Sequence, residues 1–418
     1  MPLRVILGFT DDVTIERDML HARIGVTRFR DPALAAALRS GVPVTELEAM
    51  RTTMRGRTLT EVLGVLHSRG MLRWRFEDDT GATVATASPR GLNVPWPAPP
   101  APGAPAGARL SRFALLRPIG PQRWLLESGT SDWEVRLAPD AAARLAAGDP
   151  ELLDLAGTFG LLDSTDDDPA LATWEFHDRY FASRSRLDLG GGGTFRLAGT
   201  VPPLPALERP PGVGSAVPLP PPPATTPVDY WQLTEDRRTV RVFAPDPLPL
   251  PTLSALLWHT ARVRAVRPAD PDDPHAYDAV FKPLASAGAT HAVNIWLISH
   301  NIVGLDGRAW WYDGVEHALR PARGQTPLPP GAYGAPVTML LTSRHARLAW
   351  KYEAIAYALA LKDVGVLMHA LQLTGTALGL GVVPLGSGPV AAVAEALGVD
   401  PLEHSPVGEL VVGLPAVE

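Results

Sequence analysis

The chain has 418 residues and a formal net charge of −6, from 38 basic and 44 acidic side chains. At about 100–200 residues per domain, this length predicts roughly two to four domains. The chain has no cysteine, which excludes disulfides, thiolate zinc sites, iron–sulfur clusters and a cysteine nucleophile. Its mild acidity disfavours a protein that coats nucleic acid or an anionic membrane.

The sequence predicts a cytoplasmic protein that does not enter the membrane. The first residues turn acidic after a short apolar run and show no cleavage signal. Residues 364–384 carry no formal charge, but they include His369, Gln372 and several glycines, and they lack aromatic or basic flanks. This composition favours a buried core helix over a membrane span.

Proline marks the expected boundaries. Residues 94–107 hold six prolines and predict an extended linker, and residues 201–227 hold eleven. Neither stretch buries enough apolar surface to fold alone. Because leucines and valines are interspersed in 201–227, we expect this part of the connecting segment 169–227 to be a strap that lies on another domain.

The first half of the chain reads as two tandem winged-helix-like units, residues 1–93 and 108–168. Each combines strands, an Ala/Leu-rich helix, a short acidic helix and a Gly-Met-Leu or Gly-Leu-Leu exit. The expected helices cover 32–50, 58–70 and 140–163, and the expected strands cover 13–16, 22–29, 71–87, 112–118, 122–128 and 133–139.

Binding to DNA is the first function that such units suggest, and their charge argues against it. Residues 1–90 carry 13 arginines and 11 acidic residues, whereas phosphate binding needs clustered, unopposed cations. We therefore expect no nucleic-acid partner, and a role in binding peptide or in the architecture of the protein. The glycine run 190–193 lacks the Gly-Lys-Ser/Thr ending of a phosphate loop and predicts a flexible turn.

Residues 228–418 have a mixed α/β pattern. Within 234–263 we expect a short strand and then a helix that bears Leu253, Leu256 and Leu257. A strong strand is expected at 291–302, a second strand and turn at 309–322, a long helical region at 347–381, and the last strands at 382–386 and 408–415. After Asp363 this helical region is apolar on nearly all faces, which is typical of the centre of a large core or of a subunit interface.

No motif of a hydrolase triad or of a metal site is present, so we expect no metal. A basic cluster, formed by Arg237, Arg238, Thr239 and Arg241, precedes a hydrophobic strand. Three guanidinium groups and a hydroxyl could hold a phosphate monoester by bidentate hydrogen bonds. The alternative is a solvated basic turn.

Two turns of small residues could lie against a flat ligand. Ser286, Ala287 and Gly288 precede a strand and would let a ligand approach the backbone closely. A second compact turn consists of Pro384, Leu385, Gly386 and Ser387.

Lys351 and Tyr352 form the last candidate, in a chain with only three lysines. Adjacent side chains on a helix diverge by about 100°, so both can reach one substrate only at a helix start or a cavity corner. In a dry pocket, an amine beside a phenol could supply a base. The alternative is a lysine that snorkels beside a core tyrosine.

The order of these motifs along the chain resembles their order in proteins with the nitroreductase-like flavoprotein fold. Residues 174–186, 192–199 and 347–365 also resemble SagB/McbC-type azoline dehydrogenases, and the Lys-Tyr pair within the sequence RLAWKY is the most discriminating motif. The resemblance implies an α+β chain, with a nitroreductase-like FMN-binding domain at 228–418 behind the tandem winged-helix-like units.

The resemblance also implies roles for the candidate residues. Arg237, Arg238, Thr239 and Arg241 would hold the FMN phosphate, and Ser286, Ala287 and Gly288 would lie along the isoalloxazine ring. Pro384, Leu385, Gly386 and Ser387 would place backbone donors near its reactive edge, and Lys351 and Tyr352 would be the catalytic pair. Ala285, Thr290 and His291 depart from the family pattern. No lysine or arginine follows Lys362, so the phosphate would depend on the basic cluster, helped by arginines such as Arg344 of the partner subunit.

The implied activity is FMN-dependent oxidation of azolines to azoles, thiazoline to thiazole foremost, in a ribosomally made peptide of thiopeptide type. The implied assembly is a homodimer with FMN at its interface, together with a cyclodehydratase partner. One alternative is a general FMN nitroreductase or flavin reductase that acts on small molecules. The other is a non-enzymatic winged-helix regulator, which would bind no flavin.

Overall fold

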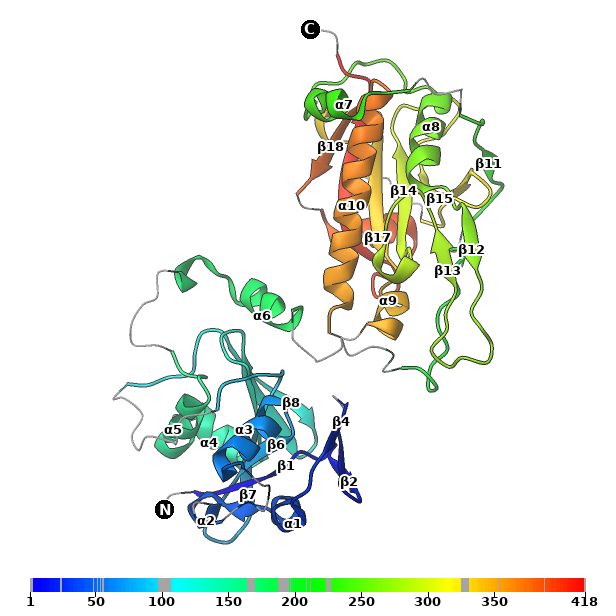
Figure 1. Cartoon of the computed structure of the whole chain (residues 1–418). Helices are drawn as coiled ribbons and strands as arrows, with labels where there is room; N and C mark the ends of the chain where they lie inside the picture. Colours follow the sequence, from blue (N-terminus) through cyan, green and yellow to red (C-terminus); the bar gives the residue numbers. More distant parts are fainter. Residues whose placement is uncertain are drawn as a thin grey trace. The chain divides into compact units, whose positions relative to one another are not determined.

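The computed structural model divides the chain into two compact units, Met1–Gly193 and Thr194–Glu418 (Figure 1). It describes residues 3–22, 25–47, 49–50, 52, 54, 56–96, 107–163, 170–186, 195, 197–207, 209–210, 212–222, 227–324, 331–352, 354–386 and 388–416. The glycine run 190–193 and most of the predicted linker 94–107 lie outside the described residues.

Unit 1 is built on a seven-stranded sheet in the order β5-β1-β6-β7-β10-β9-β8, with every described pairing antiparallel. Its strands are β1 (Arg4–Phe9), β5 (Val42–Pro43), β6 (Leu72–Glu77), β7 (Thr83–Pro89), β8 (Ala114–Gly120), β9 (Arg123–Ser128) and β10 (Trp133–Leu137). A small sheet consists of β2 (Thr14–Glu16), β3 (Met19–Ala22) and β4 (Gly25–Arg28). The helices are α1 (Pro32–Ser40), α2 (Val44–Leu47), α3 (Leu59–Ser68), α4 (Pro139–Ala146), α5 (Pro150–Thr158) and α6 (Phe176–Arg184), with a 3₁₀ turn at Leu171–Thr173.

The two predicted winged-helix-like units share this sheet and one hydrophobic core. Strand β7 of the first pairs with β10 of the second, in the register Ala87 to Val135. Across the join, the rings of Phe76 and Phe159 lie 5.9 Å apart, within the range of an edge-to-face aromatic pair. The winged-helix assignment of each half and the boundaries drawn around it stay predictions.

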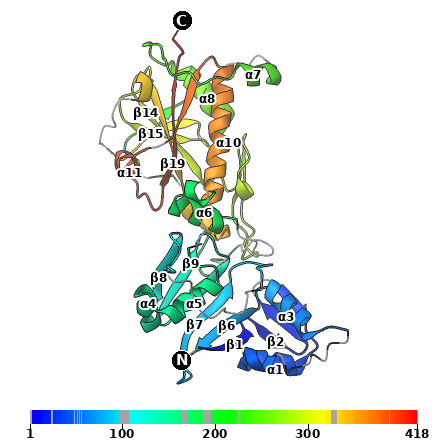
Figure 2. The same ribbon diagram turned by 90° about the vertical axis from the view of Figure 1, so that its left-hand side faces the viewer.

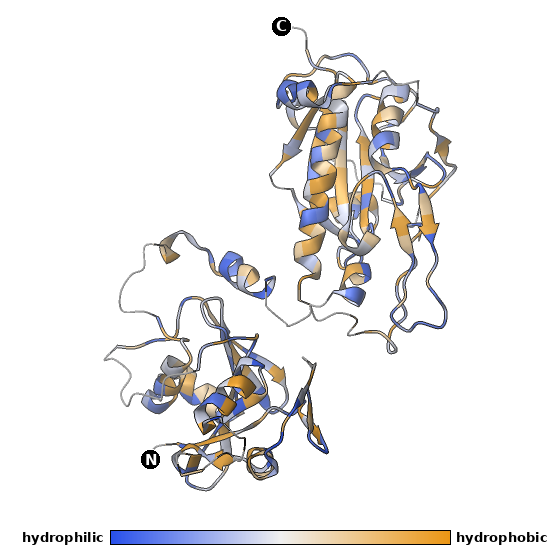
Figure 3. Cartoon of the chain, viewed as in Figure 1, coloured by the Kyte–Doolittle hydropathy of each residue, from blue (hydrophilic) through white to orange (hydrophobic). Residues whose placement is uncertain are grey.

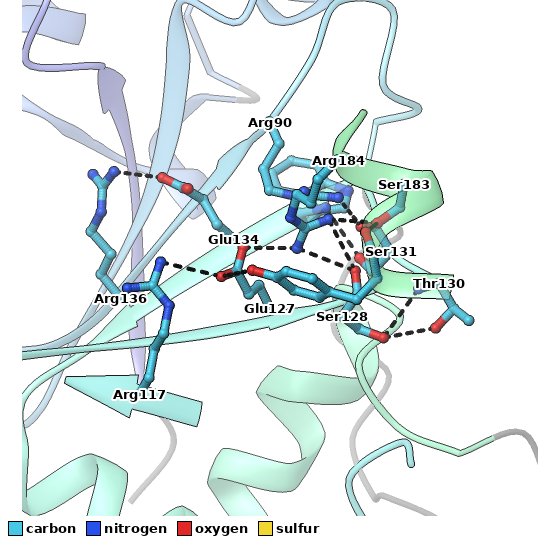
Figure 4. A network of polar contacts seen from close by, with 12 residues as sticks. Arg90, Arg117, Glu127, Ser128, Thr130, Ser131, Glu134, Arg136, Ser183 and Arg184 are labelled. Atoms are coloured by element: carbon cyan, nitrogen blue, oxygen red, sulfur yellow. Dashed lines mark hydrogen bonds and ion pairs between the residues drawn. The ribbon is translucent and has the colours of Figure 1, made fainter. Parts of the chain in front are cut away.

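A buried carboxylate attaches α6 to the end of β9 (Figure 4). Glu127 accepts hydrogen bonds from Tyr180 Oη at 2.8 Å, from Arg184 Nη2 at 2.7 Å and from Arg117 Nη2 at 3.4 Å. Burial alone would raise the pKa of Glu127, but the hydrogen bond from Tyr180 and the charge of Arg184 outweigh it, so the pKa lies below its ordinary value. Part of the predicted connecting segment, 174–186, therefore packs on unit 1.

Unit 2 contains a second seven-stranded antiparallel sheet, in the order β11-β16-β15-β14-β17-β19-β18. Its strands are β11 (Val217–Pro218), β14 (Val293–Ser299), β15 (Ala309–Asp313), β16 (Ala318–Pro321), β17 (Val337–Ser343), β18 (Gly381–Leu385) and β19 (Ser405–Gly413). A separate hairpin pairs β12 (Ala265–Arg267) with β13 (Ala279–Phe281). The central strands β14 and β17 are rich in hydrophobic residues (Figure 3).

Helices cover both faces of this sheet, and Figure 2 shows α10 and α11 on opposite sides of it. The helices are α7 (Tyr230–Asp236), α8 (Leu250–Ala261), α9 (His345–Lys351), α10 (Ala356–Ala377) and α11 (Val390–Leu397), with 3₁₀ turns at Ala287–Ala289 and Ala332–Gly334. Side chains of α8 and α10 pack with β14, β17 and β19 in the larger core, and α11 closes a smaller core with Trp296 and Trp311.

The proline-rich segment 201–222 lies along unit 2. Val217 and Pro218 pair with β16, and Leu219 is buried in the larger core. Ser254 of α8 donates a hydrogen bond to the carbonyl of Pro220. Because proline cannot donate to a ladder, this segment is held at the sheet edge and by side chains that reach its carbonyls.

The predicted helical region 347–381 is two helices rather than one. Helix α9 ends at Lys351, and Tyr352 has an extended backbone with φ −111° and ψ 125°. Helix α10 then begins at Ala356. Among the helices that the structure describes, none combines the length and the apolar character that crossing a bilayer requires. The cytoplasmic location stays a prediction.

We expect Glu127→Gln to destabilise unit 1 by about 1–3 kcal/mol at pH 7, because Arg184 and Arg117 lose their counter-charge. The pKa of Glu127 is lowered in the folded chain. Its contribution is therefore complete above the ordinary value of about 4.3 and is lost as the pH falls through the folded-state pKa. Urea unfolding followed by fluorescence should show a difference between variant and parent at pH 7 that shrinks in acid.

The matched control is Asp18→Asn, since Asp18 pairs with Arg28 and both side chains are exposed. An exposed pair contributes about 0–1 kcal/mol, so this variant should stay close to the parent. Equal effects of the two substitutions at pH 7 would contradict the importance of the Glu127 network.

Candidate active site

Lys351 and Tyr352 converge on Gly288. A β-carbon built on Gly288 would lie 2.7 Å from Lys351 Nζ, 2.7 Å from Tyr352 Oη and 2.9 Å from Tyr277 Oη. Gly288 also has a left-handed backbone, with φ 56°. Three polar side-chain ends thus meet at position 288. Only glycine, which has no side chain, fits at this position.

Tyr277 holds Lys351 in place. Lys351 Nζ donates a hydrogen bond to Tyr277 Oη, and Tyr277 Oη donates to the carbonyl oxygen of Gly288 at 2.7 Å. The Lys351 ammonium also lies 4.5 Å from the centre of the Tyr277 ring and 5.2 Å from that of Tyr352. These distances fall within the range of cation–π attraction.

The end of α9 explains how adjacent side chains reach one place. Lys351 is the last residue of α9, and Tyr352 follows it in an extended conformation. The divergence of about 100° between neighbouring helical side chains therefore does not apply. The pair lies at a helix end, a position that the sequence analysis did not consider.

Asp363 anchors the loop that carries Gly288. Its carboxylate accepts hydrogen bonds from Ser286 Oγ at 2.6 Å and from Ala287 N at 3.0 Å. Ser286 Oγ in turn accepts from His291 N at 3.0 Å. Ala289 and His291 adopt left-handed backbones, with φ 53° and 41°. Such conformations cost of order 1–3 kcal/mol and persist only where surrounding contacts impose them.

Burial raises the pKa of Asp363, and the hydrogen bonds from Ser286 and Ala287 offset part of that rise. The carboxylate thus remains a better acceptor for the loop than burial alone would allow. Asp363 therefore holds in place the segment Ser286–Gly288, which was predicted to lie along the flavin ring and on whose Gly288 the side chains of Lys351 and Tyr352 converge.

Arg347 joins the remaining walls of the site. It is 3% exposed. Its Nε donates to the carbonyl of Thr290 at 2.8 Å, its Nη1 to that of Leu204 at 2.6 Å and its Nη2 to that of Asp278 at 2.5 Å. One guanidinium therefore ties together the Gly288 loop, the proline-rich segment and the strand that follows Tyr277.

Phe195 adds an aromatic wall. Its backbone N–H donates to the carbonyl of Lys351 at 2.8 Å, and its ring lies 5.6 Å from that of Trp350. Trp350 Nε1 donates to the carbonyl of Val201 at 2.7 Å. The described part of the segment 192–199, which carries one share of the family resemblance, thus contacts the segment that carries the Lys-Tyr pair.

The basic cluster lies elsewhere. Arg237 caps the C-terminal end of α7, and Arg238, Thr239 and Arg241 are exposed in the chain that follows. Their side chains make no hydrogen bond or ion pair with other described residues. The cluster lies against the start of β18, since a β-carbon on Gly381 would be 2.9 Å from Val240 Cβ.

The second turn follows β18. Pro384 and Leu385 are the last residues of that strand and pair with β19, Gly386 comes next, and Ser387 lies outside the described residues. The carboxylate of Glu409 packs so closely on Gly388 that a β-carbon there would be 1.7 Å from its Oε1. Burial raises the pKa of Glu409. The turn and the basic cluster stand at the two ends of β18, roughly 13 Å apart at 3.3 Å per strand residue.

The predicted residues therefore form two groups, at opposite ends of α10 (Figures 1 and 2). Ser286, Ala287, Gly288, Lys351 and Tyr352 lie near its first half, whereas the basic cluster lies beside its last turn. Helix α10 has 22 residues, which corresponds to about 33 Å. Within one chain, a single mononucleotide could not contact both the basic cluster and the Lys-Tyr pair.

Four residues near the Lys-Tyr pair were missed by the sequence analysis: Tyr277, Asp363, Phe195 and Arg347. The sequence gives a weak indication of a role for Asp363, because it is the last charged residue before a long uncharged stretch. It gives none for Tyr277, since nothing around that residue in the sequence separates it from an ordinary loop tyrosine. Across the part of the chain that is described, no group of three or more His, Asp or Glu side chains is placed to hold a metal ion.

We expect Gly288→Ala to fold and to lose most activity of the site. The new methyl group would overlap Lys351 Nζ and Tyr352 Oη, and alanine at this left-handed backbone costs about 1–2 kcal/mol. The control is Gly365→Ala, because a β-carbon at this helical position meets nothing within 4 Å. That variant should be as stable as the parent or slightly more so. Thermal unfolding and turnover of both variants check the expectation, and full activity in Gly288→Ala would contradict the convergence.

The Nitroreductase family model matches residues 234–414, less than half of the chain and wholly within unit 2. No curated protein matches the chain in sequence. Among solved structures, a putative nitroreductase from Ralstonia eutropha is 21% identical with a TM-score of 0.40, covering 52% of this chain and 99% of its own. A putative nitroreductase in complex with FMN from Desulfovibrio desulfuricans is 16% identical with a TM-score of 0.30, covering 46% and 89%.

The E. coli microcin synthetase McbBCD complex with truncated pro-MccB17 bound is 18% identical with a TM-score of 0.35, covering 47% of this chain and 76% of its own. These likenesses are distant, and the family match to 234–414 carries the assignment. It confirms the predicted α+β class and the family's cofactor, FMN. Residues 234–414 are thus similar to the Nitroreductase family, which uses FMN.

Proposed function

We propose that the protein is an FMN-dependent dehydrogenase that oxidises azolines to azoles, thiazoline to thiazole foremost, in a ribosomally made peptide. The convergence of Lys351 and Tyr352 on Gly288 supports this proposal most directly. A general nitroreductase needs no such amine–phenol pair beside the small-residue loop. The same pair lies in the RLAWKY segment that resembles azoline dehydrogenases.

The residues present fit FMN. Arg237, Arg238 and Arg241 offer guanidinium groups that no described carboxylate neutralises, which suits a phosphate dianion. Thr239 adds a hydroxyl. Ser286, Ala287 and Gly288 present small side chains to a flat ring. Pro384, Leu385, Gly386 and Ser387 complete the proposed set, and a β-carbon at Gly386 would meet no atom within 4 Å, so this backbone is open to a ligand.

Because these groups lie at opposite ends of α10, we place each FMN between two copies of the chain. The basic cluster and the Pro384–Ser387 turn would come from one copy, and the Gly288 loop with the Lys-Tyr pair from the other. Helix α10 exposes the apolar side chains of Tyr357, Leu361 and Val366, which are 39%, 39% and 43% exposed. Trp231 of α7, beside the basic cluster, is 77% exposed. Apolar surface of this extent favours a covering subunit.

In the proposed reaction, Lys351 or Tyr352 removes the proton from the ring Cα, while the hydride on Cβ leaves with its electron pair. FMN, when bound, supplies the two-electron acceptor. Tyr277 holds the Lys351 amine at a set position beside the Tyr352 ring. The ring loses two hydrogens and becomes aromatic, which favours the product.

Unit 1 is proposed to dock the peptide or a cyclodehydratase partner. Its charge is nearly balanced over residues 1–90, with 13 arginines and 11 acidic residues. Such a surface suits a polypeptide better than a nucleic-acid backbone.

Lys351→Arg and Lys351→Ala should both lose about 10²–10⁴-fold in rate, because arginine keeps the charge but does not give up its proton. Tyr352→Phe should fall in the same range. The measurement is conversion of an azoline-bearing peptide, followed as a mass loss of about 2 Da per ring. Each variant should retain bound flavin by absorbance, since neither side chain is assigned to the phosphate. Parental rates in both Lys351→Ala and Tyr352→Phe would place the base elsewhere.

The shared site can be tested by mixing two inactive variants. One chain carries Arg237→Ala with Arg241→Ala, and the other carries Lys351→Ala. After co-expression, about a quarter of parental activity should return, because half of the dimers are mixed and each mixed dimer has one intact site. If each site belonged to a single chain, no mixed dimer would be active. If the variant with both Arg237→Ala and Arg241→Ala keeps full flavin occupancy when expressed alone, the phosphate site lies elsewhere.

A further inference from the structure

A cavity of about 140 Å³ lies behind the Gly288 loop, and neither the family match nor the proposed reaction assigns it a role. It is bounded by strands β13, β14 and β15 and by residues of the proline-rich segment. A smaller cavity of about 30 Å³ shares Lys282 and His291 with it and reaches Ser286 and Asp363. Since one water needs roughly 10–15 Å³ of such space, the larger cavity can hold several non-hydrogen atoms.

The polar wall of the cavity carries positive charge without a counter-ion. Lys282 lines both cavities, and burial, together with the charges of Arg344 and Arg347, lowers its pKa to about 8. No described carboxylate lies within ion-pair distance of Lys282. All three hydrogen bonds described for Arg347 go to backbone carbonyls.

The carboxylates that line the two cavities are already engaged. Asp313 accepts from Arg209 Nε at 3.1 Å and from Arg320 Nε at 2.9 Å. Asp363 accepts from Ser286 and Ala287. A partly buried ammonium with no partner is costly, which favours a ligand that supplies negative charge.

The lining of the larger cavity also includes the apolar side chains of Val263, Val280 and Ile295. An unpaired ammonium beside apolar side chains suits a ligand with a carboxylate head and a short hydrocarbon body, rather than a hydrated inorganic anion.

We propose that this cavity binds a small organic carboxylate, with Lys282 as its charge partner. The site is separate from the Lys-Tyr pair, and the proposal does not depend on the azoline activity. His291, at the end of the loop that carries Gly288, lines the cavity, so an occupant would contact the loop on which Lys351 and Tyr352 converge.

The test uses the full chain at constant ionic strength, with butyrate and benzoate as probes and 1-butanol and benzyl alcohol as their uncharged counterparts. Calorimetric titration should show saturable binding of the carboxylates and none of the alcohols. Lys282→Met should weaken carboxylate binding at least tenfold. It should also raise the thermal unfolding temperature of the ligand-free chain, because it removes an unpaired buried charge. Lys362→Met is the matched control, since Lys362 is exposed on α10 and should leave binding unchanged.

Lys282→Gln provides a second test that does not depend on the folding of Lys282→Met. It keeps a polar side chain, removes the positive charge, and should weaken benzoate binding. Three results would overturn the proposal: no saturable binding of either carboxylate, inorganic phosphate binding as tightly as butyrate, or unchanged affinity in both Lys282 variants.

Discussion

Arg347 donates hydrogen bonds to the carbonyls of Thr290, Leu204 and Asp278, which belong to three segments far apart in the sequence. A guanidinium has its donors in a rigid fork, so its hydrogen bonds set the relative position of the groups that accept them. Here they hold the Gly288 loop, the proline-rich segment and the end of the loop that contains Tyr277 around α9. The position of Lys351, four residues later at the end of that helix, depends on this attachment.

Strain in the Gly288 loop is maintained by the same surroundings. Ala289 and His291 adopt left-handed backbones that a free loop would leave, and Asp363 secures the loop through Ser286 and Ala287. The loop is therefore rigid where Lys351 and Tyr352 approach it. Rigid support of this kind is what a site needs when two side chains must reach one atom of a substrate.

The candidate residues could be predicted from the sequence because each group of them has a local composition that indicates its chemistry. Three arginines within five residues, a run of small residues before a strand and a rare lysine beside a tyrosine are visible without a fold. Tyr277 and Arg347 are not visible in this way. A tyrosine in a loop and an arginine near a helix gain their roles only from the carbonyls and side chains that folding places beside them. The helix break at Tyr352 was equally hidden, because the residues around it favour a continuous helix.

By itself, the sequence determined the mixed α/β character of residues 228–418, the candidate residues and the resemblance to FMN enzymes. These follow from residue type and from short-range periodicity, which tertiary structure does not alter. Tertiary structure decided which candidates meet: Gly288 with Lys351 and Tyr352, and the basic cluster with the start of β18. The physical reason is the length of α10. A rigid helix of 22 residues separates the two groups by a distance that is longer than one mononucleotide. No local sequence pattern encodes that distance.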